Sequence, residues 1–427
     1  MFMDSKLTII IPTFNRPQLL YRLLKYYENV DCRNKIIIAD SSNSYDAKKN
    51  SENIEYFHNK LDILYKLFPS DIDAFSKCAK ALNLVESKYI VFCADKDFVI
   101  FNSVFKCIEF LENNSDYSMA GGIIYSVYFS WLNKFNCLPN LIKINRKGLN
   151  IFSPNSNYDQ ERPDVRLKQF IRNSYSTFYA VHRKDSILNN LNLVVKYTQD
   201  HKFFELLLNC ISIVQGKFKC FDILYQVRQV KHSISGSKQW ENKWNRIFES
   251  GVFESRYERF IDCLSGELVK KTGMHPVEAR SVAKEAVDIK IVPIKDSFKR
   301  MMEYKRLQDK DLSLIHKFYK LIVWRINLLK VVLPIVMRLA LSGNRTKDII
   351  RFPIKTFRQV LSEQNDYDRF NTNGNALRID SVLNSKSPYH ADLMPIYNIV
   401  KRYPDGIEAP LNKVIPHQSC TNKLNSR

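Results

Sequence analysis

The sequence feature that most constrains the fold is an apolar run, residues 89–94, that stops at two carboxylates, Asp95 and Asp97. Such a run is typical of a strand buried on both faces of a parallel sheet. The carboxylates would then lie at its carboxyl end, where open α/β sheets bind ligands. Alternation along an extended chain predicts that both point to one side, with Lys96 on the other. Two oxygen donors so placed could bind Mn²⁺ or Mg²⁺, although Asp is also common in ordinary turns.

Two further strands are predicted to bring polar groups to the same edge. Residues 6–13 form a short apolar run followed by a loop and a helical pattern over 18–27, and a second run ends in Asp40 and two serines. A dinucleotide or NTPase site would need glycines in the first strand-to-helix turn. The chain has no glycine before Gly121. A nucleotide would therefore be held through side chains and a metal ion.

These segments resemble family 2 glycosyltransferases, which have the GT-A fold, and more closely a poorly characterised bacterial and archaeal subgroup of sugar transferases. The similar segments follow one another in order at residues 11–16, 39–42, 89–98, 177–183, 199–206 and 225–235. The resemblance covers about residues 5–240. It implies an α/β fold of the GT-A type, a Rossmann-like nucleotide-diphospho-sugar transferase domain, which the helical pattern of the later chain extends with a mainly helical C-terminal region.

The resemblance also implies an activity: a metal-dependent, inverting transferase that moves a sugar from a nucleotide-sugar donor, most simply a UDP-sugar, to a hydroxyl. The acceptor would be a glycan or a lipid-linked glycan in the synthesis of surface polysaccharide or glycoconjugates. The implied donor-nucleotide residues are Pro12, Thr13, Asn15, Arg16, Asp40 and Asp95, with Asp40 reading the base. The implied ligands of Mn²⁺ or Mg²⁺ are Asp97, Asp95 and His232.

Sugar transfer with inversion needs a base for the acceptor hydroxyl, and Asp200 is the candidate. It opens a predicted helix, so it could equally be a helix-terminal acid that the helix dipole favours. Glu205 is the substitute base, an acceptor ligand or simply a structural ion-pair partner, and Arg228 is expected at the diphosphate. His182 ends a predicted strand over 177–181 and could bind acceptor or simply satisfy backbone groups.

Two other classes of function compete with this one. A nucleotidyltransferase shares metal-bound phosphate chemistry but normally has a glycine-rich, basic signature near the first strand, which this chain lacks. A non-catalytic nucleotide- or sugar-binding protein would bind nucleotide without a metal requirement.

Composition divides the chain. The net charge is +21, yet residues 1–118 are nearly neutral, so the basic character belongs to the later segments. We expect a nucleotide-binding half at 1–118, an acceptor-binding half at 119–240, a basic helical region at 241–361 and a polar tail at 362–427. The tail is expected either to wrap over other domains or to lack order.

The basic helical region suggests a partner. Residues 314–361 hold ten basic residues and one acidic residue among apolar ones. This pattern fits an anionic membrane surface, ordinary packing on the catalytic domain or, less well, nucleic acid. Nine cysteines without a CxxC pair indicate reduced thiols, and no apolar signal segment precedes the first strand. We therefore expect a cytoplasmic protein, peripheral on the inner face of the membrane if these helices bind lipid.

Overall fold

The computed structural model describes residues 4–129, 142–145, 157–173, 177–198, 200–230, 243–311, 376–378 and 385–403. Its strands are β1 (Leu7–Thr13), β2 (Lys35–Asp40), β3 (Ile63–Leu67), β4 (Tyr89–Phe92), β5 (Phe98–Val99), β6 (Tyr117–Phe129), β7 (Ile142–Asn145), β8 (Val181–Arg183), β9 (Lys217–Val230) and β10 (Ala376–Arg378). Its α-helices are α1 (Pro17–Asn29), α2 (Ser44–Phe57), α3 (Ala74–Leu82), α4 (Phe101–Asn113), α5 (Pro163–Asn173), α6 (Lys184–Tyr197), α7 (His201–Gln215), α9 (Lys243–Glu249), α10 (Phe253–Thr272), α11 (Pro276–Asp311) and α15 (His390–Arg402).

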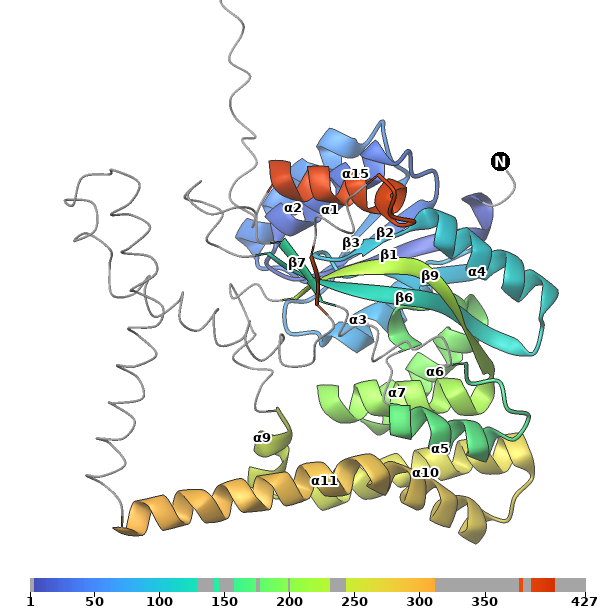
Figure 1. The fold of residues 1–427 in the computed structure, drawn as a ribbon, viewed down its shortest axis with the longest axis vertical. Helices are drawn as coiled ribbons and strands as arrows, with labels where there is room; N and C mark the ends of the chain where they lie inside the picture. The colour runs from blue at the N-terminus through green and yellow to red at the C-terminus, as the bar shows by residue number, and fades with distance from the viewer. Residues whose placement is uncertain are drawn as a thin grey trace, which may run out of the picture.

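One mixed sheet organises these elements (Figure 1). Its order in the described residues is β10-β7-β6-β8-β4-β1-β2-β3, with β9 beside β6 and β5 beside β9. Strands β3, β2, β1 and β4 are parallel, whereas β8 is antiparallel to both β4 and β6. This order confirms the predicted α/β class, and a mainly helical region follows the sheet in the chain.

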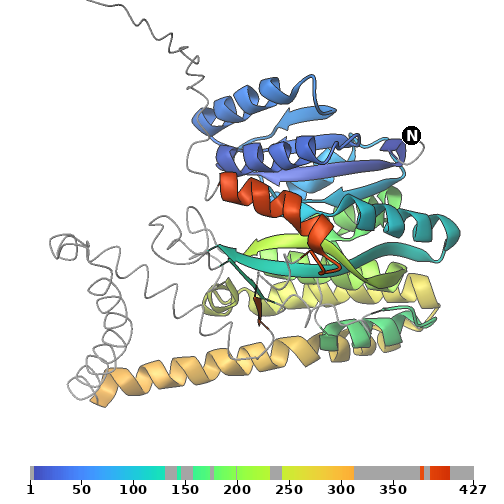
Figure 2. The same ribbon diagram turned by 45° about the horizontal axis from the view of Figure 1, so that its top comes forward.

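The three central parallel strands are buried on both faces. Every residue from Leu7 to Ile11, from Ile36 to Ala39 and from Tyr89 to Phe92 is at most 1% exposed. Parallel sheets need such cover on both faces, because their crossover helices pack there. Helices α1, α2 and α15 lie over one face of the sheet, and α3, α6 and α7 lie over the other (Figures 1 and 2).

The helical region packs directly on α7 and α5, as a further layer in Figure 1. The ring of Phe203 in α7 lies 5.2 Å from Trp244, 5.8 Å from Phe253 and 5.8 Å from Phe260, measured between ring centroids. Aromatic contacts of this kind contribute about 0.5–1.5 kcal/mol each beyond the area they bury. The hydrophobic core is therefore continuous from the sheet into α9 and α10.

One part of the polar tail packs on helix α1. Helix α15 packs along α1 and buries Leu393, Ile396 and Ile399, each 3% exposed. The ring of Tyr403 meets Tyr21 edge-on, with centroids 5.8 Å apart. Of the two alternatives for the tail, this segment takes the ordered one.

The strand predicted over 177–181 is wrong. Thr177–Tyr179 form a 3₁₀ turn, and β8 begins only at Val181. The cause lies in local side-chain hydrogen bonds, which compete with a sheet ladder. The amide of Thr177 donates to the side-chain oxygen of Asn209 (2.6 Å), and the ring of His182 binds the carbonyl of Thr177 (2.9 Å).

None of the described helices is both long enough and apolar enough to cross a membrane. Seven described cysteines are free and buried. The basic stretch 314–361 lies outside the described residues, so its predicted membrane contact stays a prediction.

Candidate functional site

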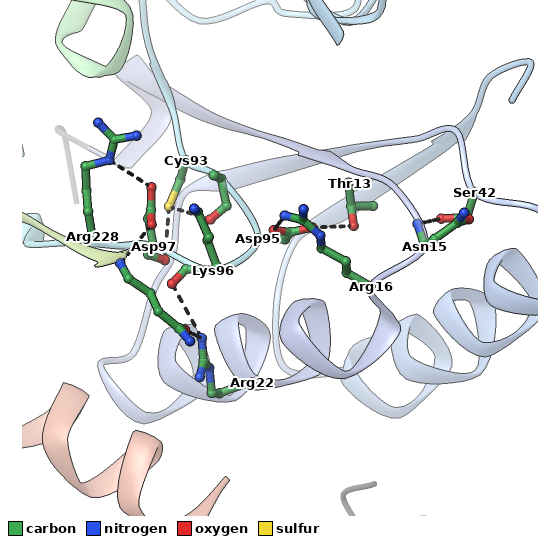
Figure 3. A network of polar contacts seen from close by, with 12 residues as sticks. Thr13, Asn15, Arg16, Arg22, Ser42, Cys93, Asp95, Lys96, Asp97 and Arg228 are labelled. Atoms are coloured by element: carbon green, nitrogen blue, oxygen red, sulfur yellow. Dashed lines mark hydrogen bonds and ion pairs between the residues drawn. The ribbon is translucent and has the colours of Figure 1, made fainter. Parts of the chain in front are cut away.

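The two carboxylates that follow β4 lie on a turn and not on an extended strand. Strand β4 ends at Phe92, and the amide of Asp97 donates to the carbonyl of Ala94 (2.9 Å). The predicted alternation, with both carboxylates on one side, is therefore wrong, because the backbone curls before either residue. Figure 3 shows Asp95 and Asp97 facing opposite ends of this turn, each toward an arginine.

Asp95 faces the first strand-to-helix loop. Its two oxygens accept from the hydroxyl of Thr13 (2.9 Å) and from Nη1 of Arg16 (3.4 Å). The Asp95 side chain is 3% exposed, while that of Arg16 is 33% exposed. The arginine therefore joins a buried carboxylate to the surface of the site.

Asp97 faces the far end of β9. It is fully buried, with Oδ1 accepting from the backbone amide of Gln229 (3.1 Å) and Oδ2 lying 3.5 Å from Nε of Arg228. Burial raises the pKa of Asp97, and the charge of Arg228 opposes that rise. The guanidinium of Arg228 also lies over the ring of Tyr179, 4.7 Å from its centroid.

A divalent cation fits part of this arrangement. Oδ2 of Asp97 is buried and accepts no hydrogen bond from the described residues, so a lone pair is available for a hard cation. Within the described part of the chain no three His, Cys, Asp or Glu side chains form a metal-binding group. The third predicted ligand, His232, lies outside the described residues.

The loops after β1 and β2 are tied together at the same edge. Asn15 has a left-handed backbone (φ 53°), its amide donates to Oγ of Ser42 (2.8 Å), and its side chain accepts from the amide of Asn43 (2.9 Å). Asn tolerates this backbone region better than most residues. Asn43 in turn caps α2. The predicted donor residues Thr13, Asn15 and Arg16 are thus gathered in one place, next to Pro12, which is the partly exposed partner of Ala39 in the sheet.

Asp40 is buried beneath these loops. It is 0% exposed and accepts three hydrogen bonds of 2.8 Å, from the amide of Ser42, the side-chain amide of Asn50 and the hydroxyl of Tyr65. Its carboxylate therefore sets the conformation of the β2–α2 loop. Reading of the base by Asp40 stays a prediction.

Sequence reasoning missed Lys77. Its ammonium is nearly buried (3% exposed) and donates to the carbonyl of Thr13 (2.7 Å) and to Oγ of Ser41 (2.8 Å). Burial lowers its pKa, while the charges of Asp40 and Asp95 act in the opposite sense. A lysine in an amphipathic helix gives no local sign of this, because its partners lie on other elements.

Phe14 was also missed. Between Thr13 and Asn15, it is a large apolar side chain that remains 45% exposed beside buried polar groups. Most large apolar residues of this domain are buried, so an exposed ring at the ligand edge of the sheet is a candidate stacking surface. An aromatic residue at the end of a strand, among polar neighbours, is the signal that could have found it.

The predicted base, Asp200, is the N-terminal cap of α7. One oxygen accepts from the amide of Phe203 (3.1 Å), and the other lies 3.3 Å from Nη1 of Arg256 in α10. Its side chain is 16% exposed. The cap that the sequence offered as an alternative is present, and the catalytic role stays a prediction.

The remaining two candidates come from β8 and α7. His182 is buried, binds the carbonyls of Thr177 and Phe178, and has its pKa lowered to about 4 by burial. These contacts correspond to the backbone-satisfying alternative. Glu205 acts electrostatically on Tyr179, the residue that lies under Arg228, and on Lys290 of α11.

No family model and no curated protein matches the chain. Among solved structures, S. aureus TarS 1–349 in complex with UDP-GlcNAc is similar over 66% of this chain and 72% of that chain, with 12% identity and a TM-score of 0.44. The mannosyltransferase PcManGT from Pyrobaculum calidifontis, in complex with GDP-Man and Mn²⁺, is similar over 72% and 88%, with 12% identity and a TM-score of 0.36.

Proposed function

We propose that the chain is a glycosyltransferase that moves a sugar from a nucleotide-sugar donor to a hydroxyl of its acceptor. The observation that carries this proposal is the convergence of three strand ends on one sheet edge. Thr13, Asp40 and the turn with Asp95 and Asp97 meet there without any glycine-rich phosphate loop. A nucleotide at this edge would be bound mainly by side chains.

Two arginines are suited to the donor diphosphate. Arg16 and Arg228 each have side chains that are 33% exposed, and each is anchored on a nearly or fully buried carboxylate. A guanidinium offers a planar fork of donors that matches phosphate oxygens. The buried aspartates hold the inner side of each arginine, so the outer side is left for the diphosphate of the donor. We propose that this donor is a UDP-sugar.

Asp97 and Asp95, with His232, would hold Mn²⁺ or Mg²⁺. When bound, the cation would supply positive charge where the diphosphate leaves. Asp97 keeps Oδ2 free of hydrogen bonds from the described residues, whereas both oxygens of Asp95 have partners. We therefore assign the main contact to Asp97 and a supporting or ribose contact to Asp95.

For the chemical step we propose a single displacement with Asp200 as base. The carboxylate would take the proton of the acceptor hydroxyl while the hydroxyl oxygen bonds to the anomeric carbon and the bond to the diphosphate breaks. The acceptor would be a glycan or a lipid-linked glycan. The ion pair with Arg256 in α10 would hold the Asp200 carboxylate in place.

The test is a screen of UDP-, GDP-, CMP- and dTDP-sugars for release of the nucleotide, with Mn²⁺ and with a chelator instead. We expect one donor to release its nucleotide in a metal-dependent way, faster when the acceptor is present. The anomeric configuration of the product, read by NMR, should be inverted. Release of pyrophosphate from a nucleoside triphosphate and a sugar phosphate would instead indicate a nucleotidyltransferase.

A further inference from the structure

Arg22 lies in α1, beneath the turn of the proposed donor site and outside the short segments that carry the family resemblance (Figure 3). It is 1% exposed, and its guanidinium lies over the ring of Phe98, 5.3 Å from the centroid. Burying a guanidinium is costly unless its donors are engaged. The partners of Arg22 therefore indicate why it is there.

Two hydrogen-bond partners of Arg22 lie next to Asp97. Its Nη2 donates to the side-chain oxygen of Gln229 (2.5 Å) and to the carbonyl of Lys96 (3.4 Å). Lys96 precedes Asp97 in the turn, and the backbone amide of Gln229 donates to Oδ1 of Asp97 (3.1 Å). Arg22 thus holds the turn on one side of Asp97 and the strand that binds its carboxylate on the other.

The hydrogen-bonded network that links Arg22 to Asp97 is shielded from water. Gln229 is 2% exposed and Asp97 is 0% exposed, so neither carries a competing hydration shell. In such surroundings a hydrogen bond to a charged group is stronger than at a surface, and breaking it leaves buried polar groups unsatisfied. This network fixes Oδ1 of Asp97, and Oδ2 faces Arg228.

We propose that Arg22 is a positioning residue of the donor site, which acts through Gln229 and the Lys96 carbonyl to hold the Asp97 carboxylate with Oδ2 facing Arg228. The expected effect of Arg22 on nucleotide binding rests on the proposed function, whereas its effect on the ordering of the turn is independent of that function. If Arg22 only stabilised α1, its loss would speed amide exchange throughout the described structure, and the turn would be affected no more than other segments.

The experiment uses the full chain as wild type, Arg22→Met, Arg22→Lys and Gln229→Leu. Gln229→Leu keeps the backbone amide but removes the partner of Arg22. The matched control is Arg166→Met, since Arg166 is also buried (3% exposed) and binds backbone carbonyls, among them those of Ile213 and Val214, away from the turn.

Two quantities are measured: amide hydrogen exchange by mass spectrometry, and affinity for UDP with Mn²⁺ by calorimetry. Arg22→Met and Gln229→Leu should speed exchange in residues 94–99 and 226–230 while β1 and α7 exchange as in wild type. Affinity should fall roughly tenfold, as for the loss of one charge-assisted hydrogen bond. Arg22→Lys should recover part of both, and Arg166→Met should change neither at the turn.

Wild-type exchange at the turn in both Arg22→Met and Gln229→Leu would overturn the proposal. Equal acceleration throughout the chain would also overturn it, because Arg22 would then be merely structural. If Arg22→Met does not fold, Gln229→Leu and Arg22→Lys give the same decision. If wild type binds no nucleotide, the proposed function fails, and the exchange pattern still decides whether Arg22 positions the turn.

Discussion

The two groups of polar candidate residues have different surroundings. At the carboxyl ends of the parallel strands, Thr13 ends β1, Asp40 ends β2 and Asp95 lies in the turn after β4, and hydrogen bonds join these loops. Beyond these strands, Asp200 caps α7 and His182 of β8 binds backbone carbonyls inside the core. A polar residue at the end of a buried parallel strand is thus a better guide to a site than one within mixed segments, where helix caps and backbone partners need the same residue types.

The largest effect that this comparison predicts follows Asp97→Asn. Asn keeps the shape of the side chain but removes the charge that would hold a cation and Arg228, so transfer activity should fall by roughly 10² or more. Mn²⁺-dependent stabilisation by UDP, measured as a thermal shift, should vanish while the unliganded protein stays folded.

The matched control is Asp116→Asn, a carboxylate with a 54% exposed side chain that pairs with Lys217 away from the turn. It should behave as wild type in both assays. Near-normal UDP binding with Mn²⁺ in Asp97→Asn would show that Asp97 does not bind the metal. The proposed metal site after β4 would then be contradicted.

Asp200→Asn tests the proposed role of Asp200 as the base. If Asp200 is the base, turnover should fall by roughly 10² to 10⁴ with donor affinity near wild type. Because Asn is nearly as good an N-terminal cap as Asp, thermal stability should change little.

Arg256→Gln is the comparison variant for Asp200, since it breaks the ion pair but leaves the carboxylate. It should keep most of the turnover. Equal losses in Asp200→Asn and Arg256→Gln would mean that the pair between α7 and α10 matters, and that the base lies elsewhere.

His182 should make stability depend on pH. Its pKa is lowered to about 4 in the folded chain, against an ordinary value near 6.5, so the unfolded chain binds more protons between these values. The free energy of unfolding should therefore fall as pH decreases, with a contribution from His182 of about 2 kcal/mol by pH 5. Urea unfolding at pH 7 and pH 5 measures it.

His182→Gln should remove that contribution, since an amide can still donate to a carbonyl but does not titrate in this range. A variant with the same pH dependence as wild type would show that His182 is not the buried neutral group. A loss of acceptor binding at unchanged stability would move it from the core to the site.

Sequence patterns predicted the central strands well, because runs such as 89–92 are apolar at every position. They did not predict α2, whose buried residues include Asn50 and Asn53, or α15 within a polar tail. Apolar periodicity cannot mark a helix that buries amides or one that packs through a few residues.

The candidate site was predictable where it depends on neighbours in sequence. The turn at Asp97 was not predictable, because strand β9 holds it in place. Arg22 and Gln229, whose side chains meet beside this turn, are 207 residues apart in the chain. Lys77 likewise reaches Thr13 across 64 residues. Buried charges whose partners come from other elements leave no local pattern.

The proposed nucleotide-sugar site is tested most directly by calorimetric titration of the full chain with UDP, in Mn²⁺ and in a chelator, with ADP as the comparison nucleotide. We expect saturable, one-to-one binding of UDP that requires Mn²⁺ and weaker or no binding of ADP. Absence of binding to UDP, and equally to GDP, CMP and dTDP in Mn²⁺, would contradict a nucleotide-sugar site at the edge formed by β1, β2 and β4.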